Sequence, residues 1–174
     1  MIIVGYPGIG KSTLASKYPG GKYIDLESSN FKELKSHEED LILNSGRRST
    51  VIPGWAIIYV RIALDLSRSG YHVFISSHES VQRALLEQIN HEDHVFVVYP
   101  ALSLKTDWLR RLRERYQYTS YTEEYIERGK KALLRAIDNY EEDIKKLHNS
   151  SFDEIVINSM DYGLEELIFG DQKN

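Results

Sequence analysis

The clearest candidate for chemistry is a glycine-rich segment near the start of the sequence, Gly5-Tyr6-Pro7-Gly8-Ile9-Gly10-Lys11-Ser12-Thr13. Its spacing is that of the Walker A motif, G-x-x-x-x-G-K-[ST]. Because glycine has no Cβ, the backbone at Gly8 and Gly10 can adopt positive φ angles and wrap closely around an anion. In this motif the lysine binds the β- and γ-phosphates of a nucleotide, and the following hydroxyl binds Mg²⁺. The segment therefore predicts binding of ATP and Mg²⁺, with Lys11 on the phosphates and Ser12 on the metal.

The residues on either side supply the elements that such a loop needs. An apolar run, Met1-Ile2-Ile3-Val4, precedes it, and Leu14-Ala15 continue into a helix. A strand before the loop and a helix after it bring successive N–H groups into one concavity, at the positive end of a helix dipole. The alternative is a glycine-rich turn that matches the motif by chance, and such a turn would need neither the strand before it nor the helix after it. We therefore interpret residues 5–13 as a phosphate-binding loop.

Asp25 is the best candidate for a carboxylate beside this loop. It lies near the end of a second apolar run, Lys22-Tyr23-Ile24-Asp25-Leu26. Ligands of parallel sheets bind outside the carboxyl ends of the strands, which is where Asp25 is expected. It would accept the proton of an attacking hydroxyl or hold the magnesium ion. A carboxylate that favours the start of the next helix is the alternative, and Glu27 is the second candidate for the same role.

The third expected strand, 71–76, ends in Ser76-Ser77-His78-Glu79 and has no carboxylate before Glu79. A metal ion would therefore depend on Ser12, Asp25, the phosphates and water, which Mg²⁺ accepts because it often keeps several waters. Ser77 and His78 are candidates for substrate binding. A helix-capping box formed by Ser76 and Glu79 explains the serines equally well.

A basic helix is expected from residue 106 to about 116, after the fourth strand. Arg111 and Arg115 are spaced i, i+4 and share one face of it. Two guanidinium groups on one face suit the charge of a transferring phosphoryl group. We therefore predict a phosphate-binding lid at about residues 104–120. A solvated face balanced by neighbouring glutamates is the alternative.

A polar loop at residues 44–50 carries Arg47 and Arg48. These cations would bind the phosphate of an acceptor, or they are solvated surface residues; the sequence favours neither.

Short apolar strands alternate with helices along the whole chain. Such alternation is typical of an α/β fold with parallel strands joined by right-handed crossovers. One helix is marked by an apolar stripe, Trp55, Ile58, Tyr59, Ile62 and Leu66. We predict a single domain over residues 1–174.

Composition excludes several other classes of protein. The 174 residues include no cysteine, which excludes disulfides and thiolate metal sites. The net charge of -4 argues against a general nucleic-acid coat, which would be basic. No apolar run approaches the roughly 18 residues that span a membrane. We expect no membrane partner and a cytoplasmic location.

Two segments resemble the P-loop kinases, the group that includes nucleoside and nucleoside-monophosphate kinases: residues 5–13 and Trp108-Leu109-Arg110-Arg111-Leu112-Arg113-Glu114-Arg115. The G-x-P-G-x-G-K-S-T form, the aspartate that ends the second strand and the R-x-x-x-R helix are also similar to phage-type polynucleotide 5′-kinases. The resemblance implies a three-layer α/β/α P-loop NTPase fold, with a five-stranded parallel sheet in the order 2-3-1-4-5 and a helical lid. It also implies an acceptor-binding region at about residues 28–70, and Asp25 as general base.

These features predict an ATP-dependent phosphotransferase, most simply a small kinase that acts on a nucleoside monophosphate or deoxynucleotide. Lys11, Asp25, Arg111 and Arg115 are its expected catalytic residues, and a nucleotide or nucleoside is its expected acceptor. Two alternatives remain open. One is a polynucleotide 5′-hydroxyl kinase, and the other is a non-catalytic ATP-binding switch or assembly factor.

Overall fold

The computed structural model describes residues 1–32, 51–117 and 123–170 of the chain, and for residues 116 and 123–133 it describes the backbone alone. The strands are β1 (Ile2–Gly5), β2 (Tyr23–Asp25), β3 (His72–Ser76), β4 (Val95–Pro100) and β5 (Asp153–Ile157). The helices are α1 (Lys11–Lys17), α2 (Ser29–Lys32), α4 (Trp55–Arg68), α5 (Glu79–Gln88), the 3₁₀ turn η1 (Leu102–Leu104), α6 (Lys105–Gln117), α7 (Glu123–His148) and α8 (Leu164–Phe169).

The five strands form one sheet in the order β2-β3-β1-β4-β5, and all of their pairings are parallel. The predicted α/β class and strand order are therefore confirmed. In the register of the sheet, Gly5 lies between Ser76 on β3 and Val98 on β4. The end of β1, where the glycine-rich segment begins, is thus in the middle of the carboxyl edge of the sheet.

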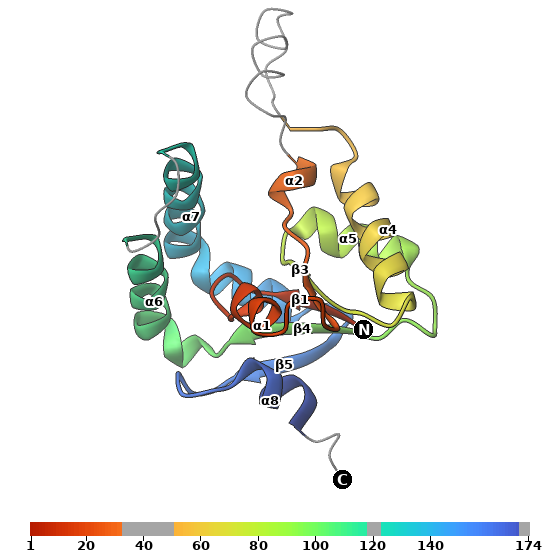
Figure 1. The fold of residues 1–174 in the computed structure, drawn as a ribbon. Helices are drawn as coiled ribbons and strands as arrows, with labels where there is room; N and C mark the ends of the chain where they lie inside the picture. Colours follow the sequence, from red (N-terminus) through yellow and green to blue (C-terminus); the bar gives the residue numbers. More distant parts are fainter. Residues whose placement is uncertain (33–50, 118–122, 171–174) are drawn as a thin grey trace, which may run out of the picture.

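Helices cover both faces of the sheet (Figure 1). Helix α1 packs against α8 on one face, while α4, α5 and α7 pack on the other. The handedness of the crossovers accounts for this division. The chain moves in one direction from β1 to β2, and it moves in the opposite direction across the sheet in the later connections. Right-handed crossovers then place α1 on one face and α4, α5 and α7 on the other.

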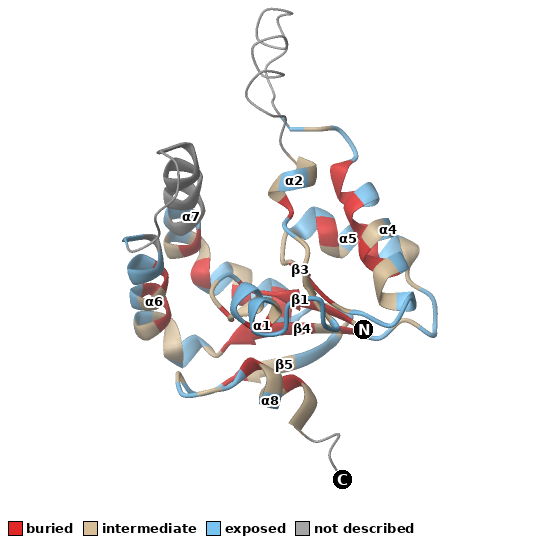
Figure 2. Cartoon of the chain, viewed as in Figure 1, coloured by how far each residue is buried: buried red, intermediate tan, exposed pale blue. Residues whose placement is uncertain are grey.

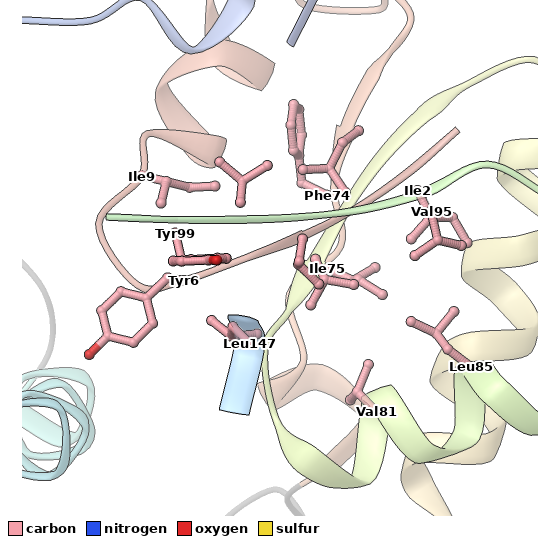
Figure 3. Close-up of a cluster of buried hydrophobic side chains, with 14 of the residues drawn as sticks. Ile2, Tyr6, Ile9, Phe74, Ile75, Val81, Leu85, Val95, Tyr99 and Leu147 are labelled. Carbon is pink, nitrogen blue, oxygen red and sulfur yellow. The ribbon is translucent and has the colours of Figure 1, made fainter. Parts of the chain in front are cut away.

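The core extends along both faces of the central strands (Figure 2). Ile2, Ile3 and Val4 of β1 have no exposed surface, so every position of this strand is apolar for a structural reason. Figure 3 shows Ile75 of β3 on the same side as Val81 of α5, with Phe74 on the opposite side of the sheet. A rigid, doubly covered β1 gives the glycine-rich segment a fixed starting point.

The apolar stripe expected on α4 is confirmed in part, since Ile62 and Leu66 are only partly buried and Ile58 is exposed. Trp55 and Tyr59 are buried, but the side chain of Ile58 is 53% exposed. Residues of an α-helix are separated by about 100° around its axis, so Ile58 lies to one side of the face that contains Tyr59.

The capping box predicted for Ser76 and Glu79 is wrong. Strand β3 continues through Ser76, and α5 begins at Glu79 with His78 as its N-cap residue. Among the described residues, no side chain caps this N-terminus. The side-chain amide of Gln82 instead donates a hydrogen bond from Nε2 to the Ser77 carbonyl, at 3.1 Å.

Helix α7 has 26 residues, but it carries many charged side chains. Within the described parts of the chain, no helix is both long and apolar enough to span a bilayer.

Candidate functional site

The glycine loop, Gly5–Gly10, connects β1 to the first turn of α1. Gly8 and Gly10 have φ angles of 89° and 99°, a region that side chains with a Cβ rarely adopt, and Gly10 is the N-cap residue of α1. Gly5 is required for a different reason: a Cβ there would lie 2.5 Å from Cδ1 of Ile9 and 2.8 Å from Cδ of Lys11. The loop therefore has the backbone shape that the motif predicts for wrapping an anion at a helix N-terminus.

Lys11 is partly buried where the loop crosses the ends of β1 and β3. Its ammonium group donates to the carbonyl oxygens of Gly5 at 3.4 Å and Ile75 at 3.2 Å. Burial lowers the pKa of this amine, the carboxylates of Asp25 and Glu27 oppose that effect, and Arg115 adds to it. A desolvated cation with two neutral acceptors would gain much from a bound anion.

The structure places Asp25 beside Ser12. The Ser12 hydroxyl donates a 2.5 Å hydrogen bond to Oδ2 of Asp25, because α1 packs over the end of β2. Both side chains supply the hard oxygen atoms that Mg²⁺ prefers. Within the described residues, no group of three or more histidine, aspartate or glutamate side chains is arranged so that it could hold a metal ion. A metal site there would therefore need oxygen atoms from a phosphate ligand as well.

Glu27, the second candidate carboxylate, is exposed and lies two residues beyond β2. Its Oε1 accepts a 3.4 Å hydrogen bond from the backbone N–H of Ser29, the first residue of α2. Glu27 thus has the helix-starting role that was the alternative for Asp25, whereas Asp25 contacts Ser12 in the first turn of α1.

The basic helix α6 is attached to the core by one apolar face, and Trp108 on that face is completely buried. Arg111 lies against this face: it donates to the Tyr162 hydroxyl at 3.0 Å and to the Met160 carbonyl at 3.2 Å. Arg110, in contrast, is exposed and pairs with Asp107 at 2.7 Å. The arginines of α6 therefore divide between a solvated face and a face directed at the glycine loop.

Two aromatic side chains hold carbonyl groups of the loop. The indole Nε1 of Trp108 donates to the Pro7 carbonyl at 2.9 Å, and the Tyr162 hydroxyl donates to the Ile9 carbonyl at 2.9 Å. Sequence reasoning missed both contacts. Trp108 is in the segment that resembles a lid, but nothing in the sequence around Tyr162 relates it to the loop.

An open pocket of about 1170 Å³ begins at the loop and runs between α1 and α8. This volume is sufficient for a nucleotide. Arg111 and Arg115 both line it, so the structure brings together the i, i+4 pair and the loop. Its lining residues are Gly8, Ile9, Gly10, Ser12, Thr13, Leu14, Ser16, Lys17, Tyr23, Arg111, Arg115, Tyr162, Gly163, Leu164, Glu165, Glu166, Phe169 and Gly170.

The end of β3 also lies beside Lys11, whose ammonium group donates to the Ile75 carbonyl. Tyr59 joins it to β2, since its hydroxyl accepts from the Ser76 N–H at 3.0 Å and donates to the Leu26 carbonyl at 2.6 Å. The ring of His78 meets that of Trp55 edge to face, with centroids 5.8 Å apart. Ser77 is half-buried beside His78. These residues form an aromatic wall near the carboxyl edge of the sheet.

The charge of His78 depends on this environment. Burial lowers its pKa to about 4, and the positive charges of Lys32, Arg135 and Lys11 act in the same direction. The imidazole is therefore neutral at pH 7, although several cations lie near it. These cations belong to α2, α7 and α1, and their combined positive charge near His78 favours a negatively charged group there.

We expect stability to fall as the pH decreases from 6.5 to 4, in part because of His78. Its pKa is about 4 in the folded state and 6.5 in the unfolded state, so the unfolded chain binds more protons in this range. His78→Gln should flatten this part of the curve of unfolding free energy against pH, measured by urea denaturation. A His78 ring that titrates near pH 6.5 by NMR would contradict this expectation.

Arg47 and Arg48, the predicted acceptor-binding cations, lie outside the described residues. The same holds for the middle of the expected acceptor-binding region and for residues 118–120 of the expected lid.

No protein-family model matches the chain, and no curated protein is significantly similar to it. The function is therefore inferred from the residues of the site.

Proposed function

We propose that this protein has a P-loop NTPase fold and is an ATP-dependent phosphotransferase, a small kinase with a nucleotide as acceptor. One observation carries the proposal: a glycine loop with positive φ angles at Gly8 and Gly10, a partly buried lysine and the Ser12–Asp25 pair meet at the carboxyl edge of the sheet. Phosphoryl transfer depends mainly on positioning and on neutralising charge, and this group of residues supplies both.

ATP is the proposed donor. Its phosphates would lie in the glycine loop, against the N–H groups at the start of α1 and the ammonium group of Lys11. Its nucleoside would occupy the pocket beside Tyr162, where Arg111 and Arg115 are suited to the charge of the triphosphate.

Ser12 and Asp25 would hold Mg²⁺ together with the phosphates, since hydroxyl and carboxylate oxygens fit this ion. When bound, the ion neutralises charge on the phosphate oxygens.

The acceptor would approach from the end of β3, where His78 and Trp55 form a wall and the side chains of Lys32 and Arg135 add positive charge. An oxygen of the acceptor forms a bond to the γ-phosphorus, and the bond between that phosphorus and the β,γ-bridging oxygen breaks, so that ADP leaves. A phosphate acceptor attacks with an ionised oxygen. A hydroxyl acceptor releases a proton, which Asp25 would accept.

The experiment is to incubate the purified protein with ATP and Mg²⁺ and a panel of nucleoside monophosphates and nucleosides, and to measure ADP. We expect ADP to form only when a particular acceptor is present. Hydrolysis that does not depend on any acceptor would overturn the kinase proposal, and Lys11→Ala is the control that tests whether the loop is responsible.

The position of Asp25 also supports a second candidate, a polynucleotide 5′-hydroxyl kinase, because this acceptor needs a base beside the loop. Transfer of labelled phosphate from ATP to an oligonucleotide with a 5′-hydroxyl end would favour it. Tight ATP binding without transfer to any acceptor would instead identify an ATP-binding switch or assembly factor.

A further inference from the structure

The glycine loop is held from outside by two side chains from distant parts of the chain. Trp108 of α6 donates to the Pro7 carbonyl, and Tyr162, between β5 and α8, donates to the Ile9 carbonyl, both at 2.9 Å. The two carbonyls lie on either side of Gly8. A Cβ at Gly8 would be 2.8 Å from Cδ2 of Leu112 and 3.3 Å from Nε1 of Trp108, so the loop is packed directly against α6.

These two contacts fix the direction of the loop N–H groups. In a trans peptide unit, the carbonyl of one residue and the N–H of the next point in opposite directions. The loop peptides are trans, so the N–H groups of Gly8 and Gly10 point away from Trp108 and Tyr162 respectively. Groups fixed in this way need no rearrangement when an anion binds, which lowers the cost of binding.

The two donors are also held by each other and by Arg111. The rings of Trp108 and Tyr162 are stacked, with centroids 6.2 Å apart and an interplanar angle of 15°. The guanidinium group of Arg111 lies 5.1 Å from the first ring and 5.2 Å from the second, and it donates to the Tyr162 hydroxyl. With its proton directed at Ile9, the hydroxyl accepts from Arg111, so each group fixes the orientation of the next.

We propose that Trp108 and Tyr162 are positioning residues that keep the glycine loop in its phosphate-binding shape. This proposal rests on the proposed function, because it assigns the loop to the phosphates of a nucleotide. It goes further in one respect: the affinity for phosphate groups depends on two side chains that need not touch the phosphates.

The test compares Tyr162→Phe with the wild type for binding of inorganic tripolyphosphate, ATP and adenosine, by calorimetry. The variant keeps the ring and loses only the hydroxyl. We expect it to bind tripolyphosphate and ATP about tenfold more weakly, the effect of one lost hydrogen bond, and to bind adenosine within about twofold of the wild type. Trp108→Phe, which removes the other donor, should give the same pattern.

Tyr99→Phe is the matched control. It also removes one tyrosine hydroxyl, which forms hydrogen bonds with Glu154 of β5 and His148 at the end of α7. It should lower the unfolding temperature and leave the affinity for tripolyphosphate unchanged.

A double-mutant cycle separates a direct action on the loop from an action through Arg111. If Tyr162 acts on the loop, Tyr162→Phe still weakens binding in an Arg111→Ala background, although by less than about tenfold because Arg111 no longer holds the hydroxyl. If the effect disappears there, Tyr162 only positions Arg111, and the proposal is overturned.

The remaining outcomes are distinct. If the wild type binds the polyphosphate probes and both single variants bind them equally well, or if adenosine affinity falls as much as tripolyphosphate affinity, the positioning role is wrong while the proposed function stands. If the wild type binds neither ATP nor tripolyphosphate, the proposed function and the positioning role are both overturned.

Discussion

Lys11→Met should weaken ATP binding by about a hundredfold or more, equivalent to about 3 kcal/mol, since hydrogen bonds from a charged group are among the strongest in proteins. The free protein, however, should be at least as stable as the wild type. The ammonium group of Lys11 is desolvated, and its acceptors are the carbonyls of Gly5 and Ile75 at 3.4 and 3.2 Å. Methionine keeps the apolar stem of the side chain and removes a charge whose burial is unfavourable.

The sign of the pH dependence follows from the lowered pKa of Lys11. Because the folded state binds this proton less tightly than the unfolded state, the group destabilises the fold, and it does so fully at any pH below its pKa in the folded state. This cost is relieved as the pH rises from the folded pKa towards the unfolded value of 10.5. Lys11→Met has no ammonium group, so its free energy of unfolding should lack both this cost and this dependence on pH.

Thermal unfolding with and without ATP and Mg²⁺ measures both effects. A ligand that binds only the folded state raises the unfolding temperature. At an ATP concentration about ten times the dissociation constant of the wild type, the wild type should show this rise, and Lys11→Met should show almost none. Lys146→Met, which removes a surface lysine paired with Glu142 on α7, should keep it. A Lys11→Met protein that ATP stabilises as much as the wild type would show that the nucleotide phosphates do not lie in the glycine loop.

Asp25→Asn should reduce the rate of phosphoryl transfer by about 10²–10⁴-fold if Asp25 acts as general base, the usual contribution of such a group. Asparagine has nearly the same shape, and its carbonyl oxygen can still accept the hydrogen bond from Ser12. We therefore expect the fold and the affinity for ATP in the absence of metal to change little. The turnover number should fall because the carboxylate is lost from the site of transfer.

The acceptor decides which role of Asp25 is measured. With a hydroxyl acceptor, the rate should remain low at every Mg²⁺ concentration, because the base is missing. With a phosphate acceptor, higher Mg²⁺ should restore part of the rate, because the carboxylate would serve only to hold the ion. Glu27→Gln is the control: this exposed carboxylate contacts the N–H of Ser29, and its loss should change the rate less than tenfold. If Asp25→Asn is fully active, Asp25 has no catalytic or metal-binding role in phosphoryl transfer.

The positions of the strands could be predicted because each strand is a short apolar run that is recognisable in the sequence. The apolar runs give the strands, and the right-handed crossover rule limits the ways to connect them. The resemblance to P-loop kinases implied the strand order that the structure has. Asp25 was placed by the same reasoning, because a residue that ends a parallel strand must lie at the ligand edge of the sheet.

Positions at the margins of elements were predicted less well. Ile58 is apolar and fits the expected stripe, but it is 53% exposed. Ser76 and Glu79 match a capping box, but Ser76 still belongs to β3 and pairs with β1, and α5 therefore starts with His78 as its N-cap. In both cases the local pattern is compatible with two arrangements, and the packing of other elements selects one.

The sequence by itself determined the glycine loop, its lysine and hydroxyl, and the carboxylate expected beside them. Their spacing is short, and the backbone freedom of glycine and the direction of a helix start are local properties. Only the tertiary structure decided what holds the loop. Trp108 is 101 positions from Pro7, and Tyr162 is 153 positions from Ile9. No local pattern encodes such contacts, because they exist only once the sheet has brought α6 and the segment before α8 to the same edge.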